Sequence, residues 1–221
     1  MNHNVDEHGF AVISRVIDSA EQQQLLCTLG SVSGAGRRGV LALAAVAKFA
    51  RSSRILDLVR PYLPSNPIPV RAVYFDKSAD QNWLVPWHQD LTLALRARVE
   101  TPGFGAWSTK DGIPHVRPPV ELLEEMLTVR LHLDPADECN GALRVLPGSH
   151  RGGRLSPDGI QELRGDRSEF LCTASAGDAV LMRPLLLHAS SRSLSKGHRR
   201  VLHIEYAGFN LPPELEWHEA A

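Results

Sequence analysis

A histidine and an aspartate two positions apart, His88 and Asp90, are the residues of this sequence whose types and spacing point most directly to chemistry. They follow Trp83, Val85 and Trp87, whose alternation is typical of an extended chain that is covered on one side. Side chains alternate along such a chain, so His88 and Asp90 point to the same side and can bind one divalent metal. This spacing alone is a weak signal, because a polar strand end at the surface also shows it.

A second histidine, His188, follows the apolar run 179–187, so we expect it at the end of a buried strand. Two histidines and one carboxylate that leave coordination positions open form the site type of non-haem Fe(II) oxygenases. Such a site also needs a cation for a carboxylate-bearing co-substrate, and a guanidinium makes a fixed two-pronged contact with a carboxylate. Arg199 meets this need if a turn at residues 193–197 joins adjacent strands and returns Arg199 to His188, with Arg200 pointing away. The alternative is an ordinary histidine at a strand end.

The bulk composition limits the classes of protein that remain. The 221 residues include 24 Lys and Arg and 25 Asp and Glu, which argues against a nucleic acid or an anionic membrane as the main partner. No apolar run approaches the roughly 20 residues of a membrane span, and the polar residues 1–8 lack the apolar core of a signal peptide. The widely spaced Cys27, Cys139 and Cys172 are typical of reduced thiols. We therefore expect a cytoplasmic protein, whose oligomeric state the sequence does not predict.

The elements expected to position these residues change in character near residue 67. Before it, Asp18 with Glu21 three positions later predicts a capped helix to about Leu29, and residues 41–50 and 53–63 also have helical spacing. Residues 9–13 are expected to be a strand and residues 31–39 a loop. After it, short apolar runs at residues 70–75, 128–133, 142–146, 170–173, 179–182 and 201–206 are separated by turn signals. This pattern predicts a single, mainly β domain over residues 1–221, with an N-terminal helical layer (1–66) packed on one face of an antiparallel jelly-roll or barrel core (67–210).

Residues 101–119 form a long connection that is rich in glycine and proline and contains Phe104, Trp107 and His115. Irregular connections of this length are usually functional or disordered, and the aromatic residues favour a lid that packs over a ligand. We therefore expect Trp107 to contact a substrate, and Phe75, at the end of the run 70–75, is a second candidate for such a contact. The alternative is a surface excursion with a small cluster of its own.

Taken together, these motifs resemble those of the phytanoyl-CoA dioxygenase family. The resemblance rests on His88-x-Asp90, on the runs NGAL at 140–143 and PGSH at 147–150, and on His188 with Arg199 eleven positions later. It covers most of the chain, from residue 9 to about residue 206. It implies a double-stranded β-helix, the cupin-like form of the jelly roll. It also implies an enzyme that uses Fe(II), 2-oxoglutarate and O2 to hydroxylate a small organic molecule, releasing succinate and CO2.

The resemblance also implies roles for individual residues. The implied iron ligands are His88, Asp90 and His188. Arg199 matches the arginine that binds the distal carboxylate of 2-oxoglutarate, Ser190 matches a hydroxyl that often assists, and Arg130 lies on the strand that lines the co-substrate pocket in relatives.

Two other functions remain open on the sequence. A cupin-like metal-dependent isomerase or lyase would use the same three ligands without needing Arg199. A non-catalytic protein would bind metal and 2-oxoglutarate but turn over no substrate. Two further histidines, His132 and His203, lie within predicted strands and are expected to be satisfied polar or core residues.

Overall fold

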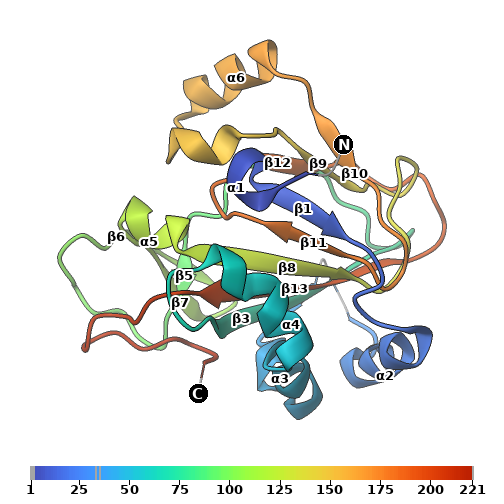
Figure 1. Cartoon of the computed structure of the whole chain (residues 1–221), viewed down its shortest axis with the longest axis horizontal. Helices are drawn as coiled ribbons and strands as arrows, with labels where there is room; N and C mark the ends of the chain where they lie inside the picture. The colour runs from blue at the N-terminus through green and yellow to red at the C-terminus, as the bar shows by residue number, and fades with distance from the viewer. Residues whose placement is uncertain (1–2, 33, 35, 221) are drawn as a thin grey trace.

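Two antiparallel β-sheets form the core of the fold (Figure 1). The computed structural model describes residues 3–32, 34 and 36–220. The larger sheet has the strand order β1-β11-β8-β13-β3-β2, and the smaller one has the order β10-β9-β12-β4. The larger sheet comprises β1 (Phe10–Ile13), β2 (Gly36–Arg38), β3 (Ile68–Lys77), β8 (Met126–His132), β11 (Ala179–Met182) and β13 (Arg199–Ala207). The smaller sheet comprises β4 (Val85–His88), β9 (Leu143–Val145), β10 (Phe170–Cys172) and β12 (His188–Ser190).

The central strands of the larger sheet alternate between an apolar face and a polar face. In β13, Leu202, Ile204 and Tyr206 pack in a cluster with the N-terminal helices, whereas His203 and Glu205 point into the space between the two sheets. The alternation follows from the pleat of a strand, in which successive side chains point to opposite faces. The inner face of this sheet is therefore unusually polar, and it supplies much of the site described below.

The N-terminal helices pack against the outer face of the larger sheet, as the sequence predicts (Figure 1). The Asp18 side chain accepts hydrogen bonds from the Ala20 and Glu21 backbone, and Glu21 reaches back to the Asp18 N–H, which is the predicted capping box. The helices here are α1 (Val5–His8), α2 (Ser19–Leu29), α3 (Ala44–Ala50) and α4 (Ser53–Val59), with 3-10 turns η1 (Val40–Ala42) and η2 (Arg60–Tyr62). Later helical segments are α5 (Val120–Glu124), η3 (Ser149–Gly152) and α6 (Pro157–Asp166).

The N-terminal third is not purely helical, because β1 and β2 are strands of the larger sheet. The prediction of a loop at residues 31–39 is wrong for Gly36–Arg38, which pair with β3; residues 33 and 35 lie outside the described residues. Gly36 permits this pairing, because a Cβ at that position would lie 2.6 Å from the Tyr74 carbonyl oxygen.

The connection at residues 101–119 is also more regular than predicted. It contains the hairpin β6 (Gly105–Lys110) and β7 (Ile113–Arg117), which forms a third sheet with β5 (Leu93–Ala94) in the order β5-β7-β6. Asp111 and Gly112 connect the two strands with φ values of 51° and 79°. Two successive residues with positive φ match the right-handed twist of a hairpin, which is why Asp-Gly is a strong hairpin signal.

A separate apolar cluster joins the two main sheets. It packs Phe10, Val180 and Met182 of the larger sheet against Val145 and Cys172 of the smaller one. This sandwich of two antiparallel sheets confirms the predicted jelly roll. Within the described part of the chain, every helix is too short or too polar to cross a lipid bilayer.

Candidate functional site

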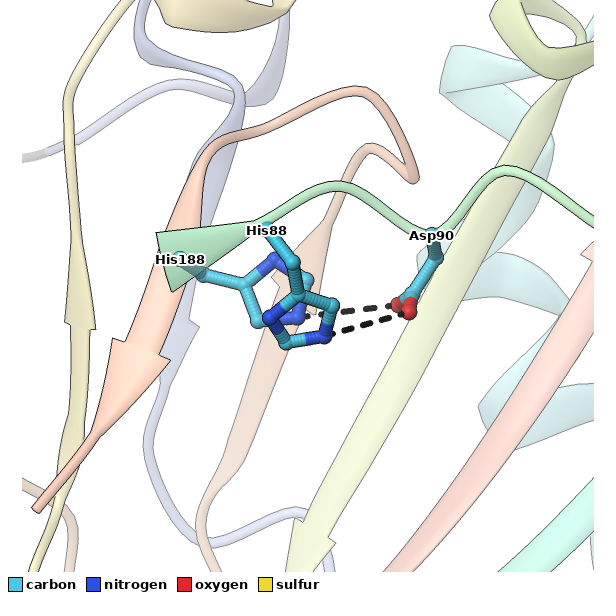
Figure 2. A group of neighbouring side chains, drawn as sticks. All are labelled: His88, Asp90 and His188. Atoms are coloured by element: carbon cyan, nitrogen blue, oxygen red, sulfur yellow. Dashed lines mark ion pairs between the residues drawn. The ribbon is translucent and has the colours of Figure 1, made fainter. Parts of the chain in front are cut away.

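His88, Asp90 and His188 converge on one point, as Figure 2 shows. The Nε2 atoms of His88 and His188 each lie 3.7 Å from an oxygen of Asp90, and one ligand atom from each residue lies within 4.8 Å of the others. One ion at the roughly 2.1 Å typical of such ligands can bridge a gap of this size. The structure therefore brings together the three residues that the sequence singled out.

Strand pairing explains how these ligands meet. His188 on β12 lies directly opposite His88 on β4, whereas Ser190 lies opposite Val85. Two residues of β4 therefore face the single residue Ala189, which is the signature of a β-bulge. Because of the extra residue, Val85 and His88, three positions apart, both line the same cavity. Asp90 follows the end of β4, and its backbone N–H donates to the Pro184 carbonyl at 2.9 Å.

Backbone carbonyls hold both histidine rings. The Nδ1 atom of His88 lies 2.9 Å from the Pro86 oxygen, and that of His188 lies 2.8 Å from the Leu186 oxygen. A carbonyl oxygen can only accept, so each Nδ1 must donate its hydrogen. In a neutral ring, Nε2 then presents its lone pair toward Asp90. Lone pairs and a carboxylate that face one another attract a cation, so the donor set fits a divalent metal.

The charge states of the site agree with this arrangement. Burial, as the largest influence, lowers the pKa of His188 to about 3, so the ring is neutral at physiological pH. Enclosure by protein would raise the pKa of Asp90, but the nearby His188, His203, His88 and Arg71 outweigh it and hold that pKa below its ordinary value. Neutral imidazole and ionised carboxylate are the forms that bind metal.

The three residues face a cavity of about 430 Å³ between the two sheets. At its inner end is a group of cations that we call the inner cluster: Arg130 and Arg199 line the cavity, and Lys77 lies behind the lining residue Ser190. All three are buried, with exposed fractions of 0%, 7% and 3% respectively. The Nε and Nη1 atoms of Arg199 have no hydrogen-bond partner among the described residues. Buried charges are normally paired, so orphaned guanidinium nitrogens here indicate a place for an anion.

Lys77 is the member of the inner cluster that the sequence did not reveal. Its Nζ donates to the Ser190 hydroxyl at 3.1 Å and to the Ser191 carbonyl oxygen at 2.6 Å, and it lies over the Trp83 ring. Burial, followed by the charges of Arg199 and Arg130, lowers the pKa of Lys77 to about 7. Burial and Arg130 likewise lower the pKa of Arg199 to about 10, which still leaves it charged at neutral pH.

Arg199 reaches the site by a route other than the predicted one. It lies on β13 in the larger sheet, whereas His188 lies on β12 in the smaller sheet, so the two strands are not hydrogen-bonded neighbours. They face each other across the cavity, because the jelly roll places the inner faces of its two sheets opposite one another. Arg200 points away, as predicted, and forms a two-pronged pair with Asp134 at 2.7 Å.

A line of polar side chains runs from the inner cluster along the floor of the cavity. The Nη1 atom of Arg130 donates to Nδ1 of His203 at 2.9 Å. His203 Nε2 therefore carries the hydrogen, and it lies 3.4 Å from Glu205, which also pairs with Arg71 at 2.7 Å. Burial lowers the pKa of His203 and keeps it neutral. His203, Glu205 and Arg71 are cavity residues that sequence reasoning missed; His203 had been interpreted only as a satisfied or core residue.

His132 is the other histidine that the sequence predicts to be a satisfied polar or core residue. It is fully buried, but neither ring nitrogen has a hydrogen-bond partner among the described residues. Burial, with Arg130 and Arg199 nearby, lowers the pKa of His132 to about 3. It is thus a core residue, as predicted, but not a satisfied one.

The two residues predicted to contact a substrate lie in different places. Phe75 on β3 lines the cavity, with the Arg130 guanidinium 5.9 Å from its ring centre. Trp107 does not belong to the cavity lining; its ring packs against the apolar cluster around Leu93 and Val116, and Arg98 lies over it. The strand pleat of β6 turns Trp107 away from the cavity, so the predicted contact is not present in this arrangement. Closure of the hairpin over a ligand stays a prediction.

Comparison with known proteins agrees with this geometry. Residues 5–201 match the family described as phytanoyl-CoA dioxygenase (PhyH). The chain belongs to this family. The bovine peroxisomal phytanoyl-CoA dioxygenase is 31% identical over 91 residues, which cover 35% of this chain and 27% of that protein. A probable alpha-ketoglutarate-dependent hypophosphite dioxygenase of Stutzerimonas stutzeri is 27% identical over 185 residues, or 77% of this chain and 56% of that protein.

Among solved structures, the apo form of EctD from S. alaskensis superposes with a TM-score of 0.73. The match covers 98% of this chain and 82% of EctD at 18% identity, and so it shows a shared fold. The matches to the bovine and Stutzerimonas proteins span about a quarter and about half of those relatives' lengths. Family membership and fold are therefore established, and the activity has to be argued from the site itself.

Proposed function

We propose that this protein is an Fe(II)- and 2-oxoglutarate-dependent oxygenase that hydroxylates a small organic molecule and releases succinate and CO2. One observation carries the proposal: a potential metal site of two histidines and one carboxylate shares a cavity with buried cations that lack a counter-charge. A metal site alone would serve many reactions. A metal site beside an orphaned arginine suits a co-substrate that has a metal-binding end and a distal carboxylate.

The residues fit such a pair of ligands. His88, Asp90 and His188 would hold Fe(II), which, with 2-oxoglutarate bound, supplies the activation of O2 and the oxidation. Arg199, whose Nε and Nη1 atoms have no hydrogen-bond partner among the described residues, would bind the distal carboxylate. Lys77, buried behind Ser190, would add positive charge near the same carboxylate, and its hydrogen bond leaves the Ser190 hydroxyl free to donate to that carboxylate.

The protein's own contribution is to bind, orient and exclude water. The Pro86 and Leu186 carbonyls hold the two imidazoles with Nε2 toward the metal position. Phe75, Val73 and Leu143 give the cavity apolar walls between its charged ends. Such walls displace water from the reacting groups and strengthen the electrostatic contacts within the cavity.

The proposal is tested by metal binding together with co-substrate consumption. His88→Ala, Asp90→Ala and His188→Ala should each lose stoichiometric Fe(II) binding while circular dichroism shows a folded protein. Wild-type protein with Fe(II) and O2 should convert 2-oxoglutarate to succinate, and each variant should not. If all three variants bind iron as the wild type does, the metal lies elsewhere.

Two other functions are separated by the same measurements. A metal-dependent isomerase or lyase would bind Fe(II) but neither bind nor consume 2-oxoglutarate. A non-catalytic 2-oxoglutarate-binding protein would bind both without releasing succinate with any substrate. A relative of similar fold is described as an alpha-ketoglutarate-dependent epimerase, so mass spectrometry of the product must also show the added oxygen.

A further inference from the structure

The cavity has two charged ends, and strand pairing fixes their separation. On β3 and β13, Lys77 lies opposite Arg199 at one end, and Arg71 lies opposite Glu205 at the other. Lys77 and Arg71 are six positions apart on β3, which at about 3.4 Å per residue corresponds to roughly 20 Å. The far end is therefore well beyond the reach of a 2-oxoglutarate carboxylate held by Arg199.

The candidate metal ligands lie between these ends. Ser190, two residues from His188, bonds to Lys77 of the inner cluster. Asp90, in contrast, lies within electrostatic reach of Arg71 and His203. A co-substrate that spans from Arg199 to the metal would thus leave the Arg71 end of the cavity for a second molecule.

Four cations line this second end, and we call them the outer cluster: Arg38, Arg71, Lys110 and Arg117. Two of them are already neutralised, since Arg71 pairs with Glu205 and Arg38 pairs with Asp111. Glu219, whose carboxylate accepts from the Leu41 and Ala72 N–H groups, is a further acidic group near Arg71, but it is not part of the cavity lining.

Lys110 and Arg117 remain without a carboxylate partner among the described residues. Within the described part of the chain, Lys110 donates only to the Thr92 hydroxyl, at 3.2 Å, and Arg117 has no ion pair. Partial enclosure and the charges of Arg71 and Arg38 lower the pKa of Lys110, against the opposing influence of Asp90 and Glu205. Lys110 lies at the turn of the β6–β7 hairpin and Arg117 at its open end, and both line the cavity. The Lys110 side chain reaches back to Thr92, which adjoins the Leu93–Val116 pair next to Arg117.

We infer that the substrate carries an oxyanion group, such as a carboxylate or a phosphonate, which Lys110 and Arg117 bind at the end of the cavity opposite Arg199. Describing this molecule as the substrate rests on the proposed function, whereas the anion site itself does not. An ammonium group is disfavoured there, because both carboxylates among the residues described as lining the cavity are committed: Glu205 pairs with Arg71, and Asp90 is a candidate metal ligand. A wholly apolar substrate would leave both cations facing the cavity without a partner.

The test uses small probes that differ in charge but little in shape. Zn(II)-loaded protein with a slight excess of 2-oxoglutarate, which fills the inner end, is titrated with propanoate, methylphosphonate and the neutral propanamide. Saturation-transfer NMR detects binding in the millimolar range. We expect one or both acids to bind and the amide not to bind. The tighter acid shows whether the site favours a carboxylate or a phosphonate.

The variants Lys110→Gln and Arg117→Gln remove the charges and keep polar side chains of similar reach. Together they should weaken acid binding about tenfold or more, because each removes a charge-assisted hydrogen bond. Lys48→Gln is the matched control, since Lys48 lies on α3 away from the cavity. Both target side chains are exposed, so the variants should fold as the wild type does.

Three results would overturn the inference: amide binding as tight as acid binding, no binding of either acid at millimolar concentration, or acid binding that the double variant leaves unchanged. Calorimetric titration of 2-oxoglutarate into the same samples separates this inference from the proposed function. If the wild-type protein does not bind 2-oxoglutarate, the proposed function is wrong. Intact 2-oxoglutarate binding without acid binding would sink only the assignment of the outer cluster.

Discussion

The two ends of the cavity hold their positive charge in opposite ways. The inner cluster lies on β3, β8 and β13, the central strands of the larger sheet, and it is almost completely buried with no carboxylate partner in contact among the residues that the structure describes. The outer cluster lies on the edge strand β2, on β3 and on the β6–β7 hairpin, where its side chains are either paired with carboxylates or exposed.

The difference indicates what each end has to recognise. Burying unpaired charges destabilises a fold, so such a cluster persists only where a ligand of constant structure neutralises it. A rigid, strand-borne pocket suits a co-substrate that is the same in every turnover. Cations on a hairpin can be exchanged without disturbing the core, so this end suits the molecule that differs from one family member to another.

Arg199 provides the strongest test of the inner end. Arg199→Ala should weaken 2-oxoglutarate binding roughly 30-fold or more, because losing a two-pronged contact to a partly buried carboxylate costs on the order of 2–4 kcal/mol. Fe(II) binding should change little, and calorimetry measures both ligands. Arg200→Ala is the matched control, because Arg200 is the next residue in the sequence and its guanidinium points outward to Asp134. Unchanged 2-oxoglutarate affinity in Arg199→Ala would refute the assignment and redirect attention to Arg130.

Replacing Lys77 should weaken binding of the co-substrate and at the same time stabilise the ligand-free fold. Lys77→Met should weaken 2-oxoglutarate binding about tenfold, because a positive charge near the carboxylate is lost. The same variant should raise the melting temperature of the ligand-free protein, because it removes a buried ammonium. The gain should be largest below about pH 7, where Lys77 is charged in both states, and should fade toward pH 10.5, the ordinary lysine pKa. A lower melting temperature near neutral pH would contradict this account.

The lowered pKa of Lys77 also predicts a pH dependence of binding. Below about pH 7 the ammonium is already charged, so 2-oxoglutarate affinity should be flat. Above that pH the free protein has lost this proton and must take it up on binding, so affinity should fall by up to about tenfold per pH unit. Calorimetry in buffers of different ionisation enthalpy would detect the proton uptake. Lys77→Met should abolish it, and an affinity that rises with pH would argue against Lys77 as a partner of the co-substrate.

The smallest effect is expected when a change at the outer end is tested for its influence on the ligand of the inner end. Lys110→Gln should change 2-oxoglutarate affinity by less than about twofold, because salt screens charges that lie more than about 10 Å apart. A large loss would show that the co-substrate extends to the outer cluster, and the division of the cavity described here would be wrong.

Much of this arrangement could be predicted from local patterns. The capping box at Asp18 was visible in the sequence, because it depends on residues three apart. The His88-x-Asp90 spacing and the apolar run before His188 likewise indicated side chains that the structure brings together. Asp111-Gly112 held an equally local signal for the β6–β7 hairpin, but the surrounding prolines and glycines favoured the interpretation as an irregular lid.

Other features depend on contacts between distant strands and leave no local signal. Lys77 lies beyond the predicted end of its strand, and only the packing of Ser190 and Ser191 against it shows that it is buried. His203 and Glu205 alternate with apolar neighbours in a way that ordinary surface strands also show. The packed structure shows that the helices cover the opposite face of the sheet, and only this contact places the His203 and Glu205 side chains on the inner face.

The bulge in β4 has a consequence for how this gene can change. Pro86 is exposed at the bulge, so its side chain could be exchanged with little loss of packing. Deleting Pro86 would leave Val85 and His88 two positions apart, so that a regular strand without the bulge would still carry both on the cavity face. Substitution or loss of this one codon should therefore be tolerated, whereas loss of the Gln89 codon would make His88 and Asp90 adjacent, turn them to opposite faces and abolish metal binding.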